Sequence, residues 1–415
     1  MKSLWPTKKL GEICEERKEK NIENKNLPVF TVSHLHGLVP YQNVFYKQIH
    51  SKDTRNYKIV RYNNFVFGLP TKDTLPFGYL YQENEVLVSP AYTVFSIKEK
   101  TLLHPKFLFY LFKTEKYKWT IIEIAKSQSA TRHGLPLKFY HLADFEIPLP
   151  PLPIQQKIVK ILDTIQEAVE MQEKIIEKTK ELKKSMMADL FKYGGPSFRQ
   201  GRKLKKTEIG EIPENWEVVK LVEVVREIIY GISKKGEKEG KYPLLRMNNL
   251  ENGKINCEDL QYVNLSDMDF KKFKLKKGDI LFNRTNSLEL VGKTALFDLN
   301  ENFVFSSYLL RIRTFSDKLL PEYLNYYFNF EKIQKNLKTL ASRGASQVNI
   351  SASKLKNFLI SLPSLSEQQE IAEILQTIDQ KIEIEKRKKE LYEELFKTML
   401  NKIMNQEIDV ENIEI

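Results

Sequence analysis

Two stretches of this chain carry apolar residues at spacings of three and four, the period of an amphipathic helix. One follows the Pro-rich segment LPPLPIQQKIVKIL from Leu149, and the other follows LPSLSEQQEIAEIL from Leu362. We predict long helices over residues 154–191 and 366–404. The apolar stripe contains Ile158, Ile161, Leu162, Ile165, Val169, Ile176, Leu182, Met186 and Leu190 in the first helix, and Ile371, Ile374, Leu375, Ile378, Ile382, Leu391, Leu395 and Met399 in the second.

The two helical stretches are copies of each other, because they align without a gap from Leu149 and Leu362, 213 residues apart. At about 1.5 Å per residue, each helix would be about 57 Å long, more than packing inside a small domain requires. Each predicted helix has one apolar stripe and mixed charges elsewhere, so its copy is the natural partner. We expect an antiparallel coiled coil that serves as a spacer; a dimerisation or bracing element is the alternative.

The region before each helix has shorter apolar runs broken by Pro, Gly and Asn, the pattern of strands and turns. The two regions echo each other: EVLVSPAYTVFSI matches NFVFSSYLLRIR, and HPKFLFYLF matches LPEYLNYYF. The predicted fold class is therefore α+β, a tandem duplication of two globular mixed α/β domains separated by two long helices. The expected divisions are residues 1–153 (first domain), 154–191 (helix), 192–210 (exposed basic linker), 211–365 (second domain), 366–404 (helix) and 405–415 (acidic tail).

The charge balance favours a polyanionic partner. Lys and Arg number 66 against 54 Asp and Glu, which gives a net charge of +12. Within the linker, Arg202, Lys203, Lys205 and Lys206 are candidate contacts to a phosphate backbone. No apolar run approaches the roughly 18 residues of a membrane helix, so we expect a soluble, cytoplasmic protein without a membrane partner.

Enzyme signatures are not apparent in the sequence. It contains no GxGxxG, HExxH or GxSxG motif, and Cys14 and Cys257 lack the spacing of a disulfide framework or a zinc site. We therefore expect no catalytic residues, no metal and no cofactor, which disfavours a self-contained methyltransferase or nuclease.

Four polar loops carry the chemistry that reads base edges. Arg can donate two hydrogen bonds to guanine, while Asn and Gln can pair in the same way with adenine. The candidates are Lys72 and Asp73 in FGLPTKDTLPFG; Gln128, Ser129, Thr131, Arg132 and His133 in SQSATRHGL; Arg284, Asn286 and Ser287 in FNRTNSLELVG; and Arg343, Ser346, Gln347 and Asn349 in ASRGASQVNIS. A purely solvated connection is the alternative for each loop.

The duplicated helix starts, the GEIPENWEV segment and the SPAY segment together resemble the specificity subunit of type I restriction-modification systems. The resemblance covers nearly the whole chain and follows the family order of recognition domain, helix, recognition domain, helix. One departure is that the first domain begins with WPTKKLGEI and lacks the GEIPxxW approach found before Trp216.

The resemblance implies that each domain recognises one half of a split double-stranded DNA sequence and that the helices set the spacing. It also implies two modification subunits docked on the helices, which would methylate adenine with S-adenosylmethionine, and separate restriction subunits that join the complex. A coiled-coil architectural DNA-binding or scaffold protein without sequence specificity is the alternative.

Overall fold

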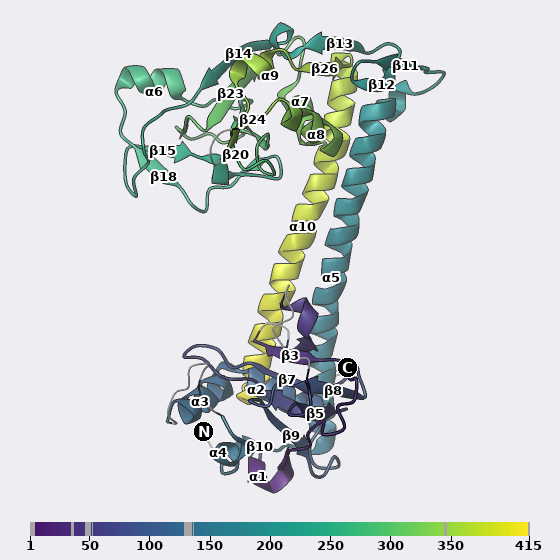
Figure 1. Cartoon of the computed structure of the whole chain (residues 1–415), viewed down its shortest axis with the longest axis vertical. Helices are drawn as coiled ribbons and strands as arrows, with labels where there is room; N and C mark the ends of the chain where they lie inside the picture. The colour runs from purple at the N-terminus through teal and green to yellow at the C-terminus, as the bar shows by residue number, and fades with distance from the viewer. Residues whose placement is uncertain are drawn as a thin grey trace. The chain divides into compact units, whose positions relative to one another are not determined.

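A computed structural model describes residues 5–34, 37–45, 51, 53–127, 135, 137–343 and 347–413. The chain forms two compact units (Figure 1). Unit 1 comprises Met1–Glu173 and Arg387–Ile415, and unit 2 comprises Lys174–Lys386. Both divisions fall inside long helices, so each long helix contributes to both units. We call the globular part of unit 1 domain 1 and that of unit 2 domain 2.

Domain 1 is built on an antiparallel sheet with the strand order β2-β9-β6-β7. These strands are β2 (Cys14–Arg17), β9 (Thr93–Ile97), β6 (Phe65–Phe67) and β7 (Phe77–Tyr79). The other elements are β1 (Thr7–Lys9), α1 (Leu10–Ile13), β3 (Phe30–Ser33), β4 (Gly37–Pro40), η1 (Tyr41–Asn43), β5 (Lys58–Arg61), β8 (Glu85–Val88), α2 (Pro105–Lys113), α3 (Glu115–Lys126), α4 (Phe139–Leu142) and β10 (Glu146–Pro148).

Aromatic residues on alternate positions of this sheet form the core of domain 1. Phe65 lies directly opposite Phe95, and their rings stack with centroids 5.2 Å apart. Phe67 and Phe112 of α2 extend the same buried cluster. Alternate residues of a strand share one face, so the run FVF places both Phe side chains in the core.

Domain 2 repeats this plan. Its main sheet has the order β14-β23-β19-β21, antiparallel throughout, so its strands correspond one by one to those of domain 1. This agreement confirms the predicted tandem duplication. The elements are η2 (Pro196–Phe198), β11 (Leu204–Thr207), β12 (Gly210–Pro213), β13 (Glu217–Lys220), η3 (Leu221–Glu223), β14 (Val225–Tyr230), β15 (Tyr242–Leu245), η4 (Met247–Asn249), β16 (Leu250–Glu251), β17 (Lys254–Ile255), β18 (Gln261–Val263), α6 (Asp267–Phe273), β19 (Ile280–Asn283), β20 (Thr285–Asn286), β21 (Thr294–Leu296), β22 (Val304–Phe305), β23 (Leu309–Thr314), α7 (Pro321–Asn329), α8 (Glu331–Thr339), β24 (Ser342–Arg343), β25 (Val348–Asn349), α9 (Ala352–Lys356) and β26 (Leu359–Leu362).

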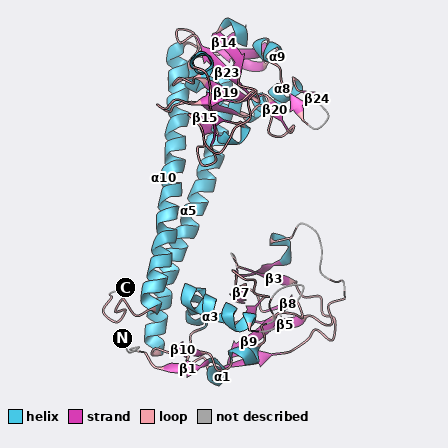
Figure 2. Ribbon diagram, turned by 90° about the vertical axis from the view of Figure 1, so that its left-hand side faces the viewer, coloured by secondary structure: helices cyan, strands magenta, loops and turns pink. Residues whose placement is uncertain are grey.

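The two predicted long helices are α5 (Leu152–Tyr193) and α10 (Leu365–Met404). Within each unit, half of α5 lies antiparallel to half of α10 (Figure 2). Ion pairs join the helices, from Lys389 to Glu173 at 2.8 Å in unit 1 and from Lys183 to Asp379 at 2.6 Å in unit 2. No helix in the described part of the chain is long and apolar enough to span a bilayer.

The first Gln of each Gln-Gln pair, Gln155 or Gln368, fixes the start of its helix. Each is fully buried, and its side-chain amide forms three hydrogen bonds to main-chain groups of the preceding loops. For Gln155 the partners are the N–H of His104 (2.8 Å) and the carbonyls of Leu102 (2.8 Å) and Pro150 (2.7 Å); for Gln368 they are the N–H of Leu320 (2.8 Å) and the carbonyls of Lys318 (3.0 Å) and Pro363 (2.9 Å). A buried amide must have such partners, which explains why the first glutamine of the pair recurs in both copies.

The predicted apolar stripe is only partly a buried seam. Ile158 and Ile371 are fully buried, but Leu182, Leu391 and Leu395 are 53%, 58% and 43% exposed. The prediction that these three leucines lie in the seam is therefore wrong. Two paired helices cover only a narrow stripe of each other, so apolar residues just outside it remain in contact with solvent.

The segment expected to be an exposed basic linker, residues 192–210, is largely exposed but has regular structure. Helix α5 continues to Tyr193, a turn of 3₁₀ helix follows, and β11 pairs with β12 in a hairpin. The N–H groups of Gly195 and Ser197 donate to carboxylates of α10, namely Glu367 (3.0 Å) and Glu370 (3.2 Å). These contacts make the segment an ordered part of unit 2.

Candidate nucleic-acid interface

The structure brings together the two predicted polar loops of domain 2. Strand β20, from FNRTNSLELVG, pairs with β25, from ASRGASQVNIS, and β25 pairs in turn with β24. Thr285 lies opposite Asn349, and Ser342 also lies opposite Asn349 from the other side. Candidate residues far apart in sequence therefore share one small sheet.

Arg284 is held in a fixed direction at the edge of this sheet. Its guanidinium carbon lies 4.9 Å from the ring centroid of Tyr230, within cation–π distance, and its Nη1 donates to the carbonyl of Ser307 at 3.2 Å. The Tyr230 hydroxyl accepts a hydrogen bond from the N–H of Ala352 at 3.0 Å. Sequence reasoning missed Tyr230, because its only signal is an aromatic residue at the end of a strand.

The other described candidates of domain 2 lie on this small sheet or next to it in sequence. Asn286 accepts from the N–H of Ser287 at 2.8 Å, and the Asn349 amide donates to the Thr285 hydroxyl at 3.0 Å. Ser287 is exposed and Gln347 is partly exposed. Hydroxyl, amide and guanidinium groups, which can contact base edges, are thus carried by one small sheet and the residues next to it.

Some predicted residues are beyond what the structure describes. Arg343 is placed on β24 by its backbone, but its side chain lies outside the described residues, as does Ser346. In domain 1 the same holds for Gln128, Ser129, Thr131, Arg132 and His133. For all of these, base contact stays a prediction.

In domain 1, Lys72 and Asp73 lie exposed in the loop between β6 and β7. The Thr71 hydroxyl holds this loop by accepting from the N–H groups of Asp73 (3.3 Å) and Thr74 (3.0 Å). The loop occupies the place that residues 284–293 occupy between β19 and β21 in domain 2. Both loops connect equivalent strands, as the sequence comparison predicted.

The equivalent of Arg284 in domain 1 is Leu69, because Phe67–Phe77 and Phe282–Thr294 are corresponding pairs at the ends of the matching strands. The next residues agree: the N–H of Gly68 donates to the carbonyl of Pro76 at 2.9 Å, and the N–H of Asn283 donates to the carbonyl of Lys293 at 2.8 Å. Leu69 is partly exposed, and its side chain has no hydrogen-bonding group. The two domains therefore differ at a candidate base-reading position.

Arg202 has to be removed from the predicted phosphate contacts. Its side chain is only 8% exposed and pairs through both terminal nitrogens with Glu367, which is fully buried. The Trp216 indole N–H donates to the same carboxylate at 3.0 Å. A guanidinium enclosed in this way is not available to a phosphate. Lys203 and Lys206 are exposed and Lys205 is partly exposed, so these three stay predictions.

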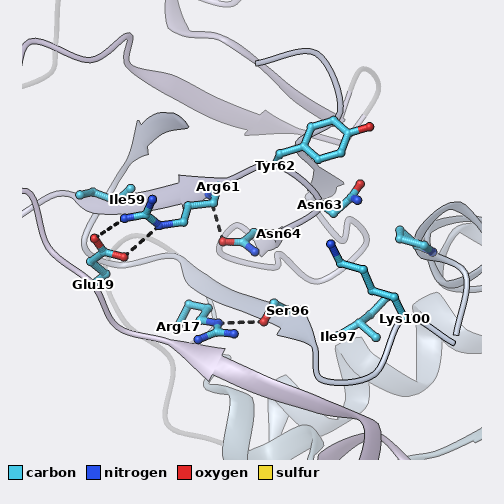
Figure 3. A pocket seen from close by; sticks show the side chains of 11 residues that line it. Arg17, Glu19, Ile59, Arg61, Tyr62, Asn63, Asn64, Ser96, Ile97 and Lys100 are labelled. Carbon is cyan, nitrogen blue, oxygen red and sulfur yellow. Dashed lines mark hydrogen bonds and ion pairs between the residues drawn. The ribbon is translucent and has the colours of Figure 1, made fainter. Parts of the chain in front are cut away.

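A cavity of about 280 Å³ in domain 1 contains several charged residues (Figure 3). Its arginines are already paired: Arg61 with Glu19 (2.6 Å) and Glu85, and Arg17 with the hydroxyl of Ser96 (2.8 Å). Arg61 holds the pKa of the Glu19 carboxyl below its usual value. We interpret the cluster as one that ties strands together, since Arg17 and Arg61 already pair with groups of domain 1.

The fold and the interface define a class: a duplicated protein whose two similar domains present different polar loops. Comparison with known proteins then gives the family. The model of the type I restriction modification DNA specificity domain matches residues 2–181 and again 213–394. The chain belongs to this family, whose role is sequence-specific DNA recognition within a larger enzyme complex, so it is a recognition subunit and not the catalyst. The architectural alternative without sequence specificity is not favoured.

Individual relatives agree with this assignment. The MjaVIII specificity subunit of Methanocaldococcus jannaschii is 30% identical over 99% of this chain and 94% of its own length. The EcoKI specificity subunit of Escherichia coli is 27% identical over 56% of this chain, and the match spans half of that relative's length. Among solved structures, the S subunit from M. genitalium has a TM-score of 0.53 at 13% identity, covering 96% of this chain and 95% of that one. A chain from a type I R-M system solved in a study of complex assembly has a TM-score of 0.58 at 18% identity, covering 96% and 97%. These structural likenesses concern the fold.

Proposed function

We propose that the two domains read the two halves of a split double-stranded DNA sequence, and that α5 and α10 set the number of unread base pairs between them. The observation that carries this proposal is the repetition of one sheet order in both domains, combined with different chemistry at the equivalent positions Leu69 and Arg284. Similar domains can dock on DNA in similar ways, while different side chains select different bases.

The proposed base-reading group of domain 2 consists of Arg284, Asn286, Ser287, Arg343, Ser346, Gln347 and Asn349. For domain 1 it consists of Lys72, Asp73, Gln128, Ser129, Thr131, Arg132 and His133. Lys203, Lys205 and Lys206 are proposed phosphate contacts, which would strengthen binding without selecting a sequence.

Exposed apolar residues on the long helices support two docking sites for modification subunits. Met171 and Leu395 are 56% and 43% exposed in unit 1, and Ile384 and Leu182 are 52% and 53% exposed in unit 2. Met171 is separated from Ile384, and Leu182 from Leu395, by the same 213 residues as the helix copies. Each unit therefore offers an equivalent pair, as two identical partners would require.

In this proposal methyl transfer from S-adenosylmethionine belongs to the two modification subunits, and cleavage belongs to restriction subunits that join the complex. The chain itself contributes recognition and needs no cofactor. We place it in the cytoplasm, because its DNA substrate is there.

Methylation mapping in cells that express the chain with its modification subunit tests the proposed function. We expect one motif made of two short sequences separated by a gap of fixed length and free composition. A single undivided motif, or methylation without any shared sequence, would contradict the proposal. Cells that express the modification subunit alone are the control.

A further inference from the structure

In unit 1, an aspartate on a long helix ties domain 1 to that helix. The Tyr110 hydroxyl on α2 donates to Asp163 of α5 at 2.5 Å, and Lys106 of α2 lies 2.6 Å from the same carboxylate. Tyr110 is almost fully buried. Burial and the neighbouring carboxylate raise the pKa of Tyr110, so the hydroxyl keeps its proton and donates.

Unit 2 contains the equivalent arrangement. The Tyr326 hydroxyl on α7 donates to Asp379 of α10 at 2.9 Å, and Lys183 of α5 lies 2.6 Å from this carboxylate. The side chain of Asp379 is only 13% exposed. One carboxylate thus joins domain 2 to both long helices.

The two aspartates do not occupy the same position of the helix repeat. Tyr110 and Tyr326 correspond in the two domains, but Asp379 aligns with Gln166, three residues or about one turn beyond Asp163. Each tyrosine nevertheless contacts a carboxylate. A contact that recurs through different helix positions is more than a remnant of the duplication.

These contacts lie well away from the start of each helix, so they can affect the angle between the domain and the helix. Gln155 and Gln368 already fix each domain at the start of a helix, as described above. Asp163 lies eight residues beyond Gln155, and Asp379 eleven residues beyond Gln368, which is about 12 and 16 Å along the helix. Apolar packing also holds each domain on the helices, through Ile158 and Leu162 in domain 1 and through Ile371 and Leu375 in domain 2. Such packing is not directional, whereas a hydrogen bond to a carboxylate at a second point along the helix favours one angle of the domain.

We propose that the Tyr110–Asp163 and Tyr326–Asp379 contacts are struts that fix the angle of each domain on the long helices and thereby keep the unread gap constant. These residues would determine specificity without touching DNA. The inference rests on the proposed function, because it assumes two half-sites separated by a gap.

The test replaces the hydroxyl alone, in Tyr110→Phe, Tyr326→Phe and the double variant, each expressed with the modification subunit. Tyr323→Phe is the matched control, since its hydroxyl on the same α7 helix donates to the carbonyl of Ser361 at 3.0 Å, inside domain 2. Methylation mapping reports both half-site sequences and the distribution of gap lengths.

We expect both half-site sequences to persist while methylation at gaps one base pair too long or too short rises by about tenfold, the effect of losing one hydrogen bond to a charged group. The control should keep the wild-type gap. Unchanged gaps in the double variant, or equal broadening in the control, would overturn the strut role. If wild-type protein yields no divided motif, the proposed function itself fails and the struts fail with it.

Discussion

Tyr230 limits the motion of Arg284 at the candidate interface. An arginine side chain carries about 2 kcal/mol of rotamer entropy, part of which is lost when it is held against a base. Stacking on Tyr230 and the hydrogen bond to Ser307 remove part of this freedom before DNA arrives. Ordering the side chain in advance lowers the cost of binding.

Arg284→Lys should weaken discrimination at the second half-site by about 1 to 3 kcal/mol, because lysine keeps the charge but loses the planar pair of donors. Discrimination at the first half-site should not change. Competition binding of the reconstituted complex to oligonucleotides substituted at single base pairs measures both. Arg226→Lys, the same change at an exposed position of β14, is the control. Equal weakening on all sequences would show that Arg284 contacts phosphate.

Arg202 shows what charge composition cannot reveal. It belongs to a basic cluster in the sequence, yet its guanidinium is buried against Glu367. One clue was present: Glu367 stands where the first helix copy has Ile154, so a carboxylate replaces an apolar residue at the start of a helix. A buried carboxylate needs a partner, but only the fold identifies which arginine provides it.

Among the elements, the long helices were predictable to within about two residues at each end, because their period extends over many turns. The small sheet of β20, β25 and β24 was not predictable. Its strands have two residues each, and β20 pairs with β25 across 64 positions of sequence, so no local pattern marks them. The sequence therefore identified the candidate loops of domain 2. It did not predict that these loops pair in one sheet, and it gave no sign of the role of Tyr230.

The proposed docking sites for modification subunits on the same helices can be tested. Leu182→Glu and Leu395→Glu should each remove one modification subunit, and the double variant both, because a charge at an apolar contact weakens binding by about tenfold or more. Native mass measurement of the reconstituted complex counts the subunits. Thr164→Glu and Thr377→Glu, exposed and also 213 residues apart, add the same charge as controls. Loss of both subunits from a single variant would contradict two independent sites.

At the scale of the whole molecule, the duplication offers a way to change spacing without changing recognition. Two modules on one face of DNA sit about 34 Å apart, one helical turn, which helices of this length can bridge. If the helices act as the ruler, their length and the unread gap must change together, while the loops of each domain continue to select the same bases.

Inserting four residues after Val169 and after Ile382, equivalent points of the repeat, tests this central claim most directly. The two insertions lengthen both helices together by about 6 Å and keep their seams matched. At about 3.4 Å per base pair, methylation mapping should show the same two half-sites with a gap longer by one or two base pairs. An unchanged gap with methylation retained would show that the helices do not set the spacing.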